Sequence, residues 1–336
     1  LYLHTERSLF VTRGRQQLGL SDNTQAFVGS GDIFEQNPDE LIPTTEGYGG
    51  SDCQFASLTT RFGQFFVNRR DRKVYMMSEN IEELSSVGME KWFLDNIPYQ
   101  LESYIDLGDD INFDSPTGNF GFNATYDPKY KRIILSKREL IPIGTFLVTL
   151  TGGYTINVDS VTNDAITISG NFPALGGKAT FSFSDTNNFR ASGWTISYYP
   201  EIKVWGSRHS YLPNLFANNQ REYYGLTTTG PTNVWEHSNF ASPGNFYNTQ
   251  YNFEFEFIDN TEVASPKIFT ALRYWLEVVE PTGIGQSSVL YKHTSPGFDA
   301  FYVYNSTQIS GDGTDPINYL SNARLVNNFW YINQFR

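Results

Sequence analysis

The chain has 336 residues, with 24 Lys or Arg against 36 Asp or Glu, so its formal net charge is −12 at pH 7. This balance argues against a surface that grips a nucleic-acid backbone, because such surfaces need a basic stripe. Aromatic residues make up 16% of the chain, and with frequent β-branched residues and Gly, Asn, Asp and Pro they exclude disorder and predict an all-β protein.

The first third of the chain predicts short strands and one helix. Residues 1–12 alternate and predict a strand followed by a turn at 13–15, and residues 26–28 predict a second short strand. Residues 86–96 are the best helix candidate, because Met89, Trp92 and Phe93 recur at a spacing of three to four.

Three hairpins share one plan: an aromatic or β-branched strand, a polar turn with a basic residue at its exit, and a return strand. This weak internal repeat predicts small sheets that stack on their neighbours, as in a β-propeller-like body. The hairpins pair residues 64–68 with 73–77, 122–126 with 132–136, and 194–199 with 203–207.

Residues 143–184 are poor in charge and rich in Thr, Gly, Val and Ile. They predict four short strands at 146–148, 154–158, 165–168 and 179–183. We interpret this segment as a small inserted β-subdomain, and the alternative is one more blade of the body. The predicted organisation is therefore a body in two parts, 1–142 and 185–336, with the insert 143–184 between them.

The C-terminal third predicts further strands. Residues 223–226 and 233–235 form a candidate pair, and residues 251–258 alternate strictly, with four aromatic side chains on one face. Candidate strands at 268–279, 298–304 and 329–332 complete the set. Short strands at regular spacing predict a sandwich, barrel or propeller.

Few residues suggest chemistry. None of the four histidines, His4, His209, His237 and His293, has metal-ligand spacing to another, so we predict structural roles for them. No Gly-x-Ser-x-Gly elbow is present. The sequence therefore predicts a protein that is not an enzyme, with no catalytic, metal or cofactor site.

An acidic cluster, Asp106, Asp109, Asp110 and Asp114, is interpreted as a solvated loop. Paired carboxylates can also serve glycoside hydrolysis, and carboxylate-rich loops can bind Ca²⁺. The segment lacks the Gly and Glu positions of a Ca²⁺-binding helix–loop–helix. It supplies the residues of the enzyme alternative, a carbohydrate-cleaving or carbohydrate-binding β-protein that would use Asp109 and Asp110.

The tetrad Arg69, Arg70, Asp71 and Arg72 is a compact basic spot in an acidic chain, at the predicted tip of the first hairpin. Arg69, Arg70 and Arg72 are candidate partner-contact residues for an acidic protein surface or DNA phosphates. A solvated turn is the alternative.

The single cysteine, Cys53, excludes an intrachain disulfide, and no run of 18 apolar residues predicts a membrane span. Both ends of the chain lie close to strand-like runs. We therefore expect it to be part of a longer protein, either because the protein is processed or because the sequence covers only a segment.

Several motifs occur in an order that resembles the large tail proteins of crAss-like podoviruses, the stabilisation or muzzle proteins at the end of the tail tube. The resemblance covers most of residues 1–260, and the insert 143–184 is unmatched. The motifs are HTERSLF at 4–10, GSGDIF at 29–34, LIPT at 41–44, GYGG at 47–50, the hairpin 63–77, GMEKWF at 88–93, TYDPKYKR at 125–132, WTISYYP at 194–200 and WGSRHSYLP at 205–213.

The resemblance implies the propeller-bearing C-terminal part of a muzzle, similar to the nozzle of short-tailed phages. Such a protein would be made in the host bacterial cytoplasm and reside in the virion tail, as a homo-oligomeric ring that closes the channel, retains packaged DNA and lets it pass on infection. Its implied partners are other copies, adaptor and ring proteins and tail fibres. DNA would pass without specific binding, because an acidic ring repels it. A third alternative is a host-receptor-binding tail protein that acts through the insert.

Overall fold

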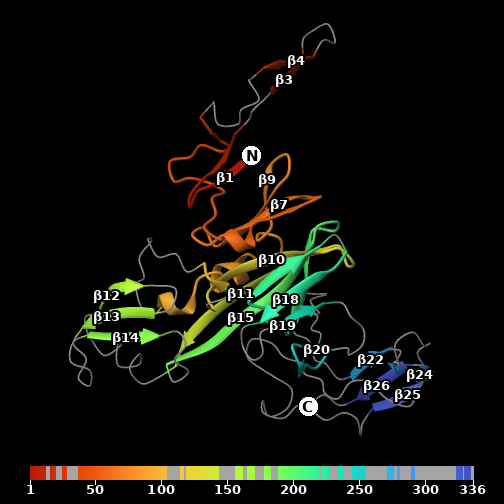
Figure 1. The fold of residues 1–336 in the computed structure, drawn as a ribbon. Coiled ribbons are helices and arrows are strands. Elements are labelled where there is room, and N and C mark those ends of the chain that lie inside the picture. The colour runs from red at the N-terminus through yellow and green to blue at the C-terminus, as the bar shows by residue number, and fades with distance from the viewer. Residues whose placement is uncertain are drawn as a thin grey trace, which may run out of the picture. The chain divides into compact units, whose positions relative to one another are not determined.

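The computed structural model of this protein describes most of the chain between residues 1 and 254, and short strands beyond it. The described residues lie mainly in antiparallel sheets and include one α-helix, so the all-β prediction is confirmed (Figure 1). No sheet closes on itself among these residues. The described ranges are 1–12, 16–19, 25–28, 37–103, 114–116, 119–143, 156–161, 165–170, 178–182, 188–219, 221–227, 233–237, 244–254, 271–275, 278–280, 289–291, 323–327 and 329–333.

Contacts divide the chain into two units. The first comprises Leu1–Asn239 with Asn245–Tyr251, and the second comprises Phe240–Gly244 with Asn252–Arg336. The boundaries predicted at 142/143 and 184/185 lie inside the first unit and stay predictions.

A four-stranded sheet in the order β10-β11-β15-β16, here called the central sheet, organises the first unit. Strands β11 and β15 pair without interruption from Ile133↔Tyr198 to Pro142↔Phe189. The second and third predicted hairpins, β10–β11 and β15–β16, are confirmed with longer strands than predicted. They lie in one sheet, whereas the internal repeat predicted separate small sheets. The strands are β10 (Gly121–Asp127), β11 (Arg132–Pro142), β15 (Phe189–Tyr199) and β16 (Val204–His209).

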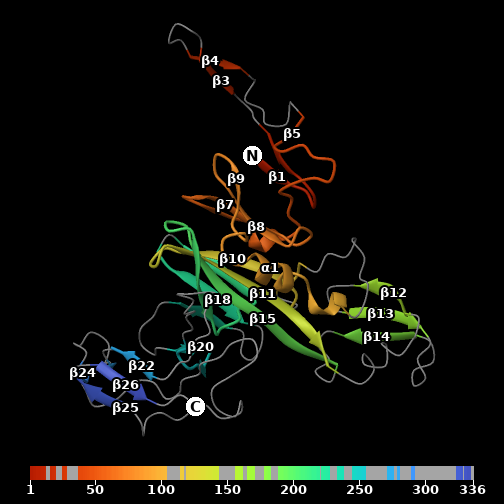
Figure 2. The same cartoon turned by 180° about the vertical axis from the view of Figure 1, so that it is seen from behind.

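The first predicted hairpin, β7 and β8, is also confirmed and lies in a second four-stranded sheet with β6 and β9. The helix α1 (Glu90–Asn96) is shorter than the predicted 86–96, because residues 85–88 form a turn with Gly88 at φ +71°. Figure 2 shows α1 beside the central sheet, where Phe93 joins a core with Phe122 and Trp194. The second sheet consists of β6 (Leu58–Thr60), β7 (Gly63–Asn68), β8 (Lys73–Met77) and β9 (Ile81–Glu83).

All three hairpins close through loops of the same length. The pairs that flank the loops are Asn68↔Lys73, Asp127↔Arg132 and Tyr199↔Val204, so each loop has four residues. The last loop residue is a basic side chain in the left-handed region in every case: Arg72 at φ +57°, Lys131 at φ +52° and Lys203 at φ +53°. Lys203 was predicted to begin the return strand and instead ends the loop.

The insert contributes its own three-stranded sheet: β12 (Ile156–Val161), β13 (Ala165–Gly170) and β14 (Lys178–Ser182). The predicted strand at 146–148 lies outside the described residues. The chain leaves the central sheet after Ile143 and returns at Asn188, and the Ile143 amide donates to the Asn188 carbonyl at 2.7 Å. The insert therefore leaves and rejoins the central sheet at one end of the β11–β15 ladder.

A third sheet, β17-β18-β19, contacts β10 through β17 and β18. Its β18–β19 pairing confirms the predicted pair at 223–226 and 233–235. The strands of this region are β17 (Leu215–Asn218), β18 (Tyr223–Thr227) and β19 (Asn233–Glu236), followed by the short pair β20 (Asn245–Phe246) and β21 (Thr249–Gln250).

At the N-terminus, the single strand predicted over 1–12 is wrong. The segment forms two antiparallel strands, β1 (Tyr2–His4) and β2 (Leu9–Val11), because the Thr5 hydroxyl and amide close a turn onto the Ser8 carbonyl. Strand β5 (Asp39–Glu40) extends this pair, and β3 (Gln16–Gly19) pairs with β4 (Gln25–Val28).

The second unit has two described sheets, β22-β26-β25 and β23-β24. These confirm strands within the predicted 268–279 and 329–332. Residues 251–254 are not in a strand, against the prediction for 251–258, and the predicted strand 298–304 lies outside the described residues. The strands are β22 (Ala271–Tyr274), β23 (Val278–Glu280), β24 (Val289–Tyr291), β25 (Ala323–Val326) and β26 (Phe329–Asn333).

Candidate functional site

The loop of the β7–β8 hairpin carries the predicted basic tetrad. The loop is fixed by Asn68, whose side-chain oxygen accepts from the Asp71 amide at 2.8 Å and whose side-chain nitrogen donates to Asp71 Oδ2 at 3.0 Å. An Asn side chain that closes onto the backbone in this way stabilises a tight turn. The tetrad is therefore a well-defined turn.

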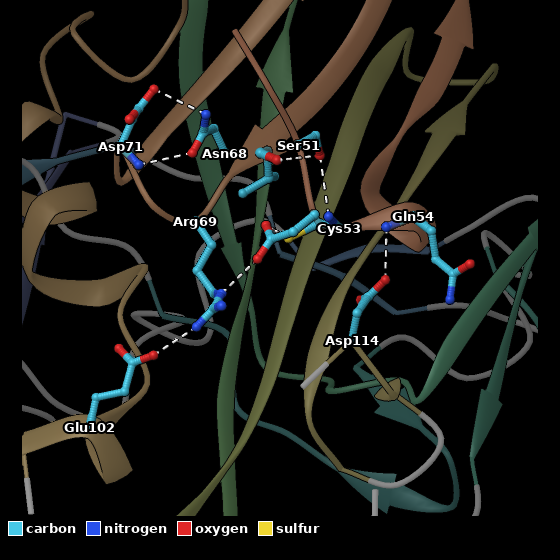
Figure 3. Close-up of polar contacts among 10 residues, drawn as sticks. Ser51, Cys53, Gln54, Asn68, Arg69, Asp71, Glu102 and Asp114 are labelled. Atoms are coloured by element: carbon cyan, nitrogen blue, oxygen red, sulfur yellow. Dashed lines mark hydrogen bonds and ion pairs between the residues drawn. The ribbon is translucent and has the colours of Figure 1, made fainter. Parts of the chain in front are cut away.

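Arg69 turns back into the protein (Figure 3). Its Nε donates to Asp52 at 2.9 Å and its Nη1 to Glu102 at 2.8 Å, and its guanidinium lies 5.6 Å from the centre of the Tyr99 ring. Burial alone would lower the pKa of Arg69, but Asp52 raises it above its ordinary value. Arg69 thus joins the loop to Asp52, just before the 3-10 turn η1 (Gln54–Ala56), and to the 3-10 turn η2 (Gln100–Ser103).

Arg70 and Arg72 lie on the same loop with exposed side chains. The three predicted partner-contact residues therefore differ in the structure. Arg69 forms ion pairs inside the protein, whereas Arg70 and Arg72 are exposed to solvent. Contact with a partner stays a prediction, and Arg70 and Arg72 are the two placed to make it. Sequence reasoning could not make this distinction, because Asp52 and Glu102 are distant from Arg69 in the chain.

Cys53 lies beside this ion pair and is buried. Its thiol donates to Asp52 Oδ1 at 3.3 Å. Burial first, and then the charge of Asp52, raise the pKa of the thiol well above its ordinary value. Because the thiolate is the nucleophilic form, Cys53 is an inert packing residue at neutral pH.

Of the predicted acidic cluster, only Asp114 lies among the described residues, and Asp106, Asp109 and Asp110 fall outside them. Asp114 Oδ2 accepts from the Gln54 amide at 2.7 Å, and so anchors η1 (Figure 3). Burial raises the pKa of Asp114 to about 6 despite this hydrogen bond. Within the described part of the chain, no group of three or more His, Cys, Asp or Glu side chains could hold a metal ion.

The described histidines pack against aromatic rings. His4 contacts Phe66 at 4.6 Å, and His237 stacks on Tyr223 with ring centres 4.6 Å apart and planes 11° apart. Burial, followed by the charge of Arg132, lowers the pKa of His209 to about 3 and that of His237 to about 4. Both rings are therefore neutral at pH 7, which fits the predicted structural role. His293 lies outside the described residues.

An open hollow of about 420 Å³ lies beside this aromatic group. Its buried carboxylate, Asp127, accepts from the amides of Lys129 and Tyr130 and pairs with Arg132 at 2.9 Å. Asp127 is thus engaged in closing the β10–β11 loop. The hollow is lined by Asp127, Pro128, Lys129, Arg221, Glu222, Tyr223, Glu236 and His237.

Sequence reasoning missed a surface at the ends of the second and third hairpins, here called the hairpin-end surface. It exposes Tyr130, Ile202 and Val204, and Ile202 is 68% exposed at the loop tip. Lys129, Lys131 and Lys203 are chain neighbours of these side chains, and Arg61 pairs with Glu201 of the third hairpin loop. The sequence pattern that could have predicted this surface is a basic residue beside an apolar one in each turn. The surface comprises Tyr130, Ile202, Val204, Arg61, Lys129, Lys131 and Lys203 with the carboxylates Glu82 and Glu201.

Ion pairs join the hairpin-end surface across separate elements. Glu201 pairs with Arg61 at 2.7 Å and with Lys131 at 3.3 Å, and Lys203 pairs with Glu82 at 2.8 Å. These pairs are exposed, so each contributes at most about 1 kcal/mol. With four cations and two carboxylates, the surface has a net charge of +2 in a chain of −12.

No described helix is long and apolar enough to cross a bilayer. No protein-family model matches the chain, and no curated protein matches its sequence.

Proposed function

We propose that this chain is a ring-forming structural subunit of a bacteriophage tail, of the muzzle or nozzle kind, and not an enzyme. The ring closes the tail channel in the virion, retains packaged DNA and lets it pass on infection. The ordered motifs that resemble crAss-like podovirus tail proteins support this proposal. The three hairpins with equal loops fit a repeated structural unit, although the second and third of them share one four-stranded sheet.

The observation that carries the proposal is the hairpin-end surface. Exposed apolar side chains flanked by cations, on a strongly acidic chain, suit contact with the acidic surface of a neighbouring copy. Such a contact joins two different surfaces of neighbouring copies. A contact of this type forms a closed ring when the rotation that relates one copy to the next brings the last copy back to the first. Arg70 and Arg72 are available for adaptor proteins, ring proteins or tail fibres.

The charge of the assembly suits its proposed task. Each copy adds −12, so a ring is strongly negative and repels DNA instead of holding it. DNA then passes without specific binding. Host-receptor binding through the insert is compatible with this role, whereas the residues of the carbohydrate alternative, Asp109 and Asp110, lie outside the described residues.

The test is particle mass and symmetry. We expect mass photometry of the purified chain to show a closed oligomer of one size, and electron microscopy of the parent particle to place that ring in the tail. The double variant I202S/V204S should lose the oligomer and keep its melting temperature, because both side chains are exposed.

Val234→Ser is the matched control, since Val234 is 65% exposed and lies on β19, a strand that belongs to none of the three hairpins. It should leave the oligomer intact. A chain that stays monomeric at all concentrations and is missing from purified particles would contradict the proposed function.

A further inference from the structure

A polar layer separates the central sheet from the β17-β18-β19 sheet. Residues paired directly across antiparallel strands point to the same face of a sheet, so Asn123, Ser136 and Thr195 lie side by side. Arg138 follows Ser136 by two residues on β11 and therefore points to the same face. The hydrogen bond between Ser136 Oγ and Thr195 Oγ1, at 3.0 Å, supports this placement. All four side chains are buried.

Arg138 carries a positive charge into this layer, and no carboxylate among the described residues pairs with it. Its Nη1 donates to the Leu212 carbonyl and its Nη2 to Asn119 Oδ1, each at 2.7 Å. Its Nε has no hydrogen-bond partner among the described residues, although Arg138 is only 3% exposed. Burial lowers the pKa of Arg138 to about 10, so the guanidinium is still charged at pH 7.

Three other buried or largely buried cations of the described chain behave differently. Arg69 pairs with Asp52, Arg132 with Asp127, and Lys137 with Glu139. An uncompensated buried charge is strongly destabilising, which is why such groups are normally paired. Among these four cations, Arg138 alone has only neutral oxygens around it.

Asn123 supplies a second, independent observation. It is 1% exposed, and both polar atoms of its side-chain amide are buried without a hydrogen-bond partner in the described structure. A buried amide in this state costs free energy on the order of 1–3 kcal/mol, and so points to a bound water or ion. Its position on β10 makes it the diagonal neighbour of Arg138 on the same face.

We propose that Arg138 and Asn123 bind a small monovalent inorganic anion of the chloride class between the two sheets. The guanidinium supplies one full positive charge and the Nε–H donor, and the amide of Asn123 supplies N–H donors. A single uncompensated charge matches a monovalent ion, whereas a phosphate needs more donors and more charge. The ion is a structural counter-charge for the polar layer.

The test compares the full-length chain in sodium chloride and in sodium gluconate at equal ionic strength, because gluconate is a much larger monovalent anion than chloride. We expect chloride to raise the stability in denaturant titrations. Above saturation, each tenfold rise in chloride should raise the folding equilibrium constant about tenfold. Equal stability of the wild-type chain in the two salts would overturn the proposal.

Two variants locate the effect. Arg138→Met and Asn123→Leu should each abolish the preference for chloride. Asn123→Leu keeps the test informative if Arg138→Met does not fold, because it removes the unsatisfied amide and keeps the branching of the side chain. Arg208→Met, on the exposed edge strand β16, is the control and should keep the preference. A preference that survives in Asn123→Leu would also contradict the site.

Discussion

At the scale of single residues, buried charge organises the first unit. Lys137 is 1% exposed, and its three N–H donors are used by Glu139 at 3.0 Å, the Asn96 carbonyl at 2.9 Å and the Pro98 carbonyl at 2.7 Å. Arg69 likewise ties three segments together. Ion pairs of this kind stabilise a fold mainly because removing one partner leaves the other buried and unpaired.

Arg69→Met should therefore lower the free energy of unfolding by about 2 kcal/mol, since it strands Asp52 and Glu102 in a partly buried site. Arg70→Met, next to it on the same loop, should change that free energy by no more than about 0.5 kcal/mol, because its side chain is exposed. Urea titration of both variants measures the difference. Equal losses would show that the ion pairs to Arg69 contribute little.

The buried histidines predict sensitivity to acid. The folded-state pKa of His237 is about 4, below the ordinary 6.5, so the unfolded chain takes up this proton first as the pH falls. The contribution of His237 to the free energy of unfolding is fully present above pH 6.5. It is lost as the pH falls from 6.5 to 4, and a pKa shift of this size corresponds to about 3 kcal/mol.

His237→Phe should flatten the decline, although it also loses the 2.9 Å hydrogen bond to Tyr247 at every pH. The raised pKa of Asp114 acts in the opposite direction in both proteins and cancels in their difference. Free energies of unfolding measured from pH 4 to 7 provide the comparison. Parallel curves for the wild type and the variant would contradict this account.

At the scale of elements, local patterns were enough where partners are close in the chain. All three hairpins were predicted, because aromatic strands flank short polar turns. The exposed state of Arg70 and the internal state of Arg69 could not be predicted, since Asp52 and Glu102 meet Arg69 only in the folded chain. The polar layer was missed for the same reason: Asn123 and Arg138 read as ordinary strand residues until β17 and β18 cover them.

The direct β11–β15 pairing yields a test of the insert. Replacing residues 144–187 by Asn-Gly should preserve the central sheet, because Ile143 and Asn188 already meet at the end of the ladder and Asn-Gly suits a two-residue hairpin turn. We expect a melting temperature within a few degrees of the wild type. Unfolding of this variant would show that residues 144–187 support the body, as a further blade would. Host adsorption, scored separately from assembly, would test receptor binding by the insert.

At the scale of the whole molecule, the chain divides into two compact units, each defined by contacts among its own residues. The three described hydrophobic clusters lie entirely in the first unit. A core of this kind is the usual requirement for independent folding. The chain charge of −12 and the basic hairpin-end surface are also properties of this scale, because they decide how copies meet.

A chain that ends at residue 251 should therefore fold by itself. We expect its circular dichroism spectrum to be that of a β-protein, and calorimetry to show one cooperative transition that is also present in the full chain. Loss of that transition would show that the second unit is needed for the first to fold. The full chain, measured at the same concentration, is the control.

The long β11–β15 ladder also has a mechanical consequence. Residues 143 and 188 lie opposite each other at one end of it, so a force that pulls these two residues apart acts on a single backbone pair at a time. The backbone pairs of the ladder would then separate one after another, from Pro142 and Phe189 toward Ile133 and Tyr198. Under a force along the strands the same hydrogen bonds would have to break together. We therefore expect the ladder to resist that force better than a force that separates residues 143 and 188.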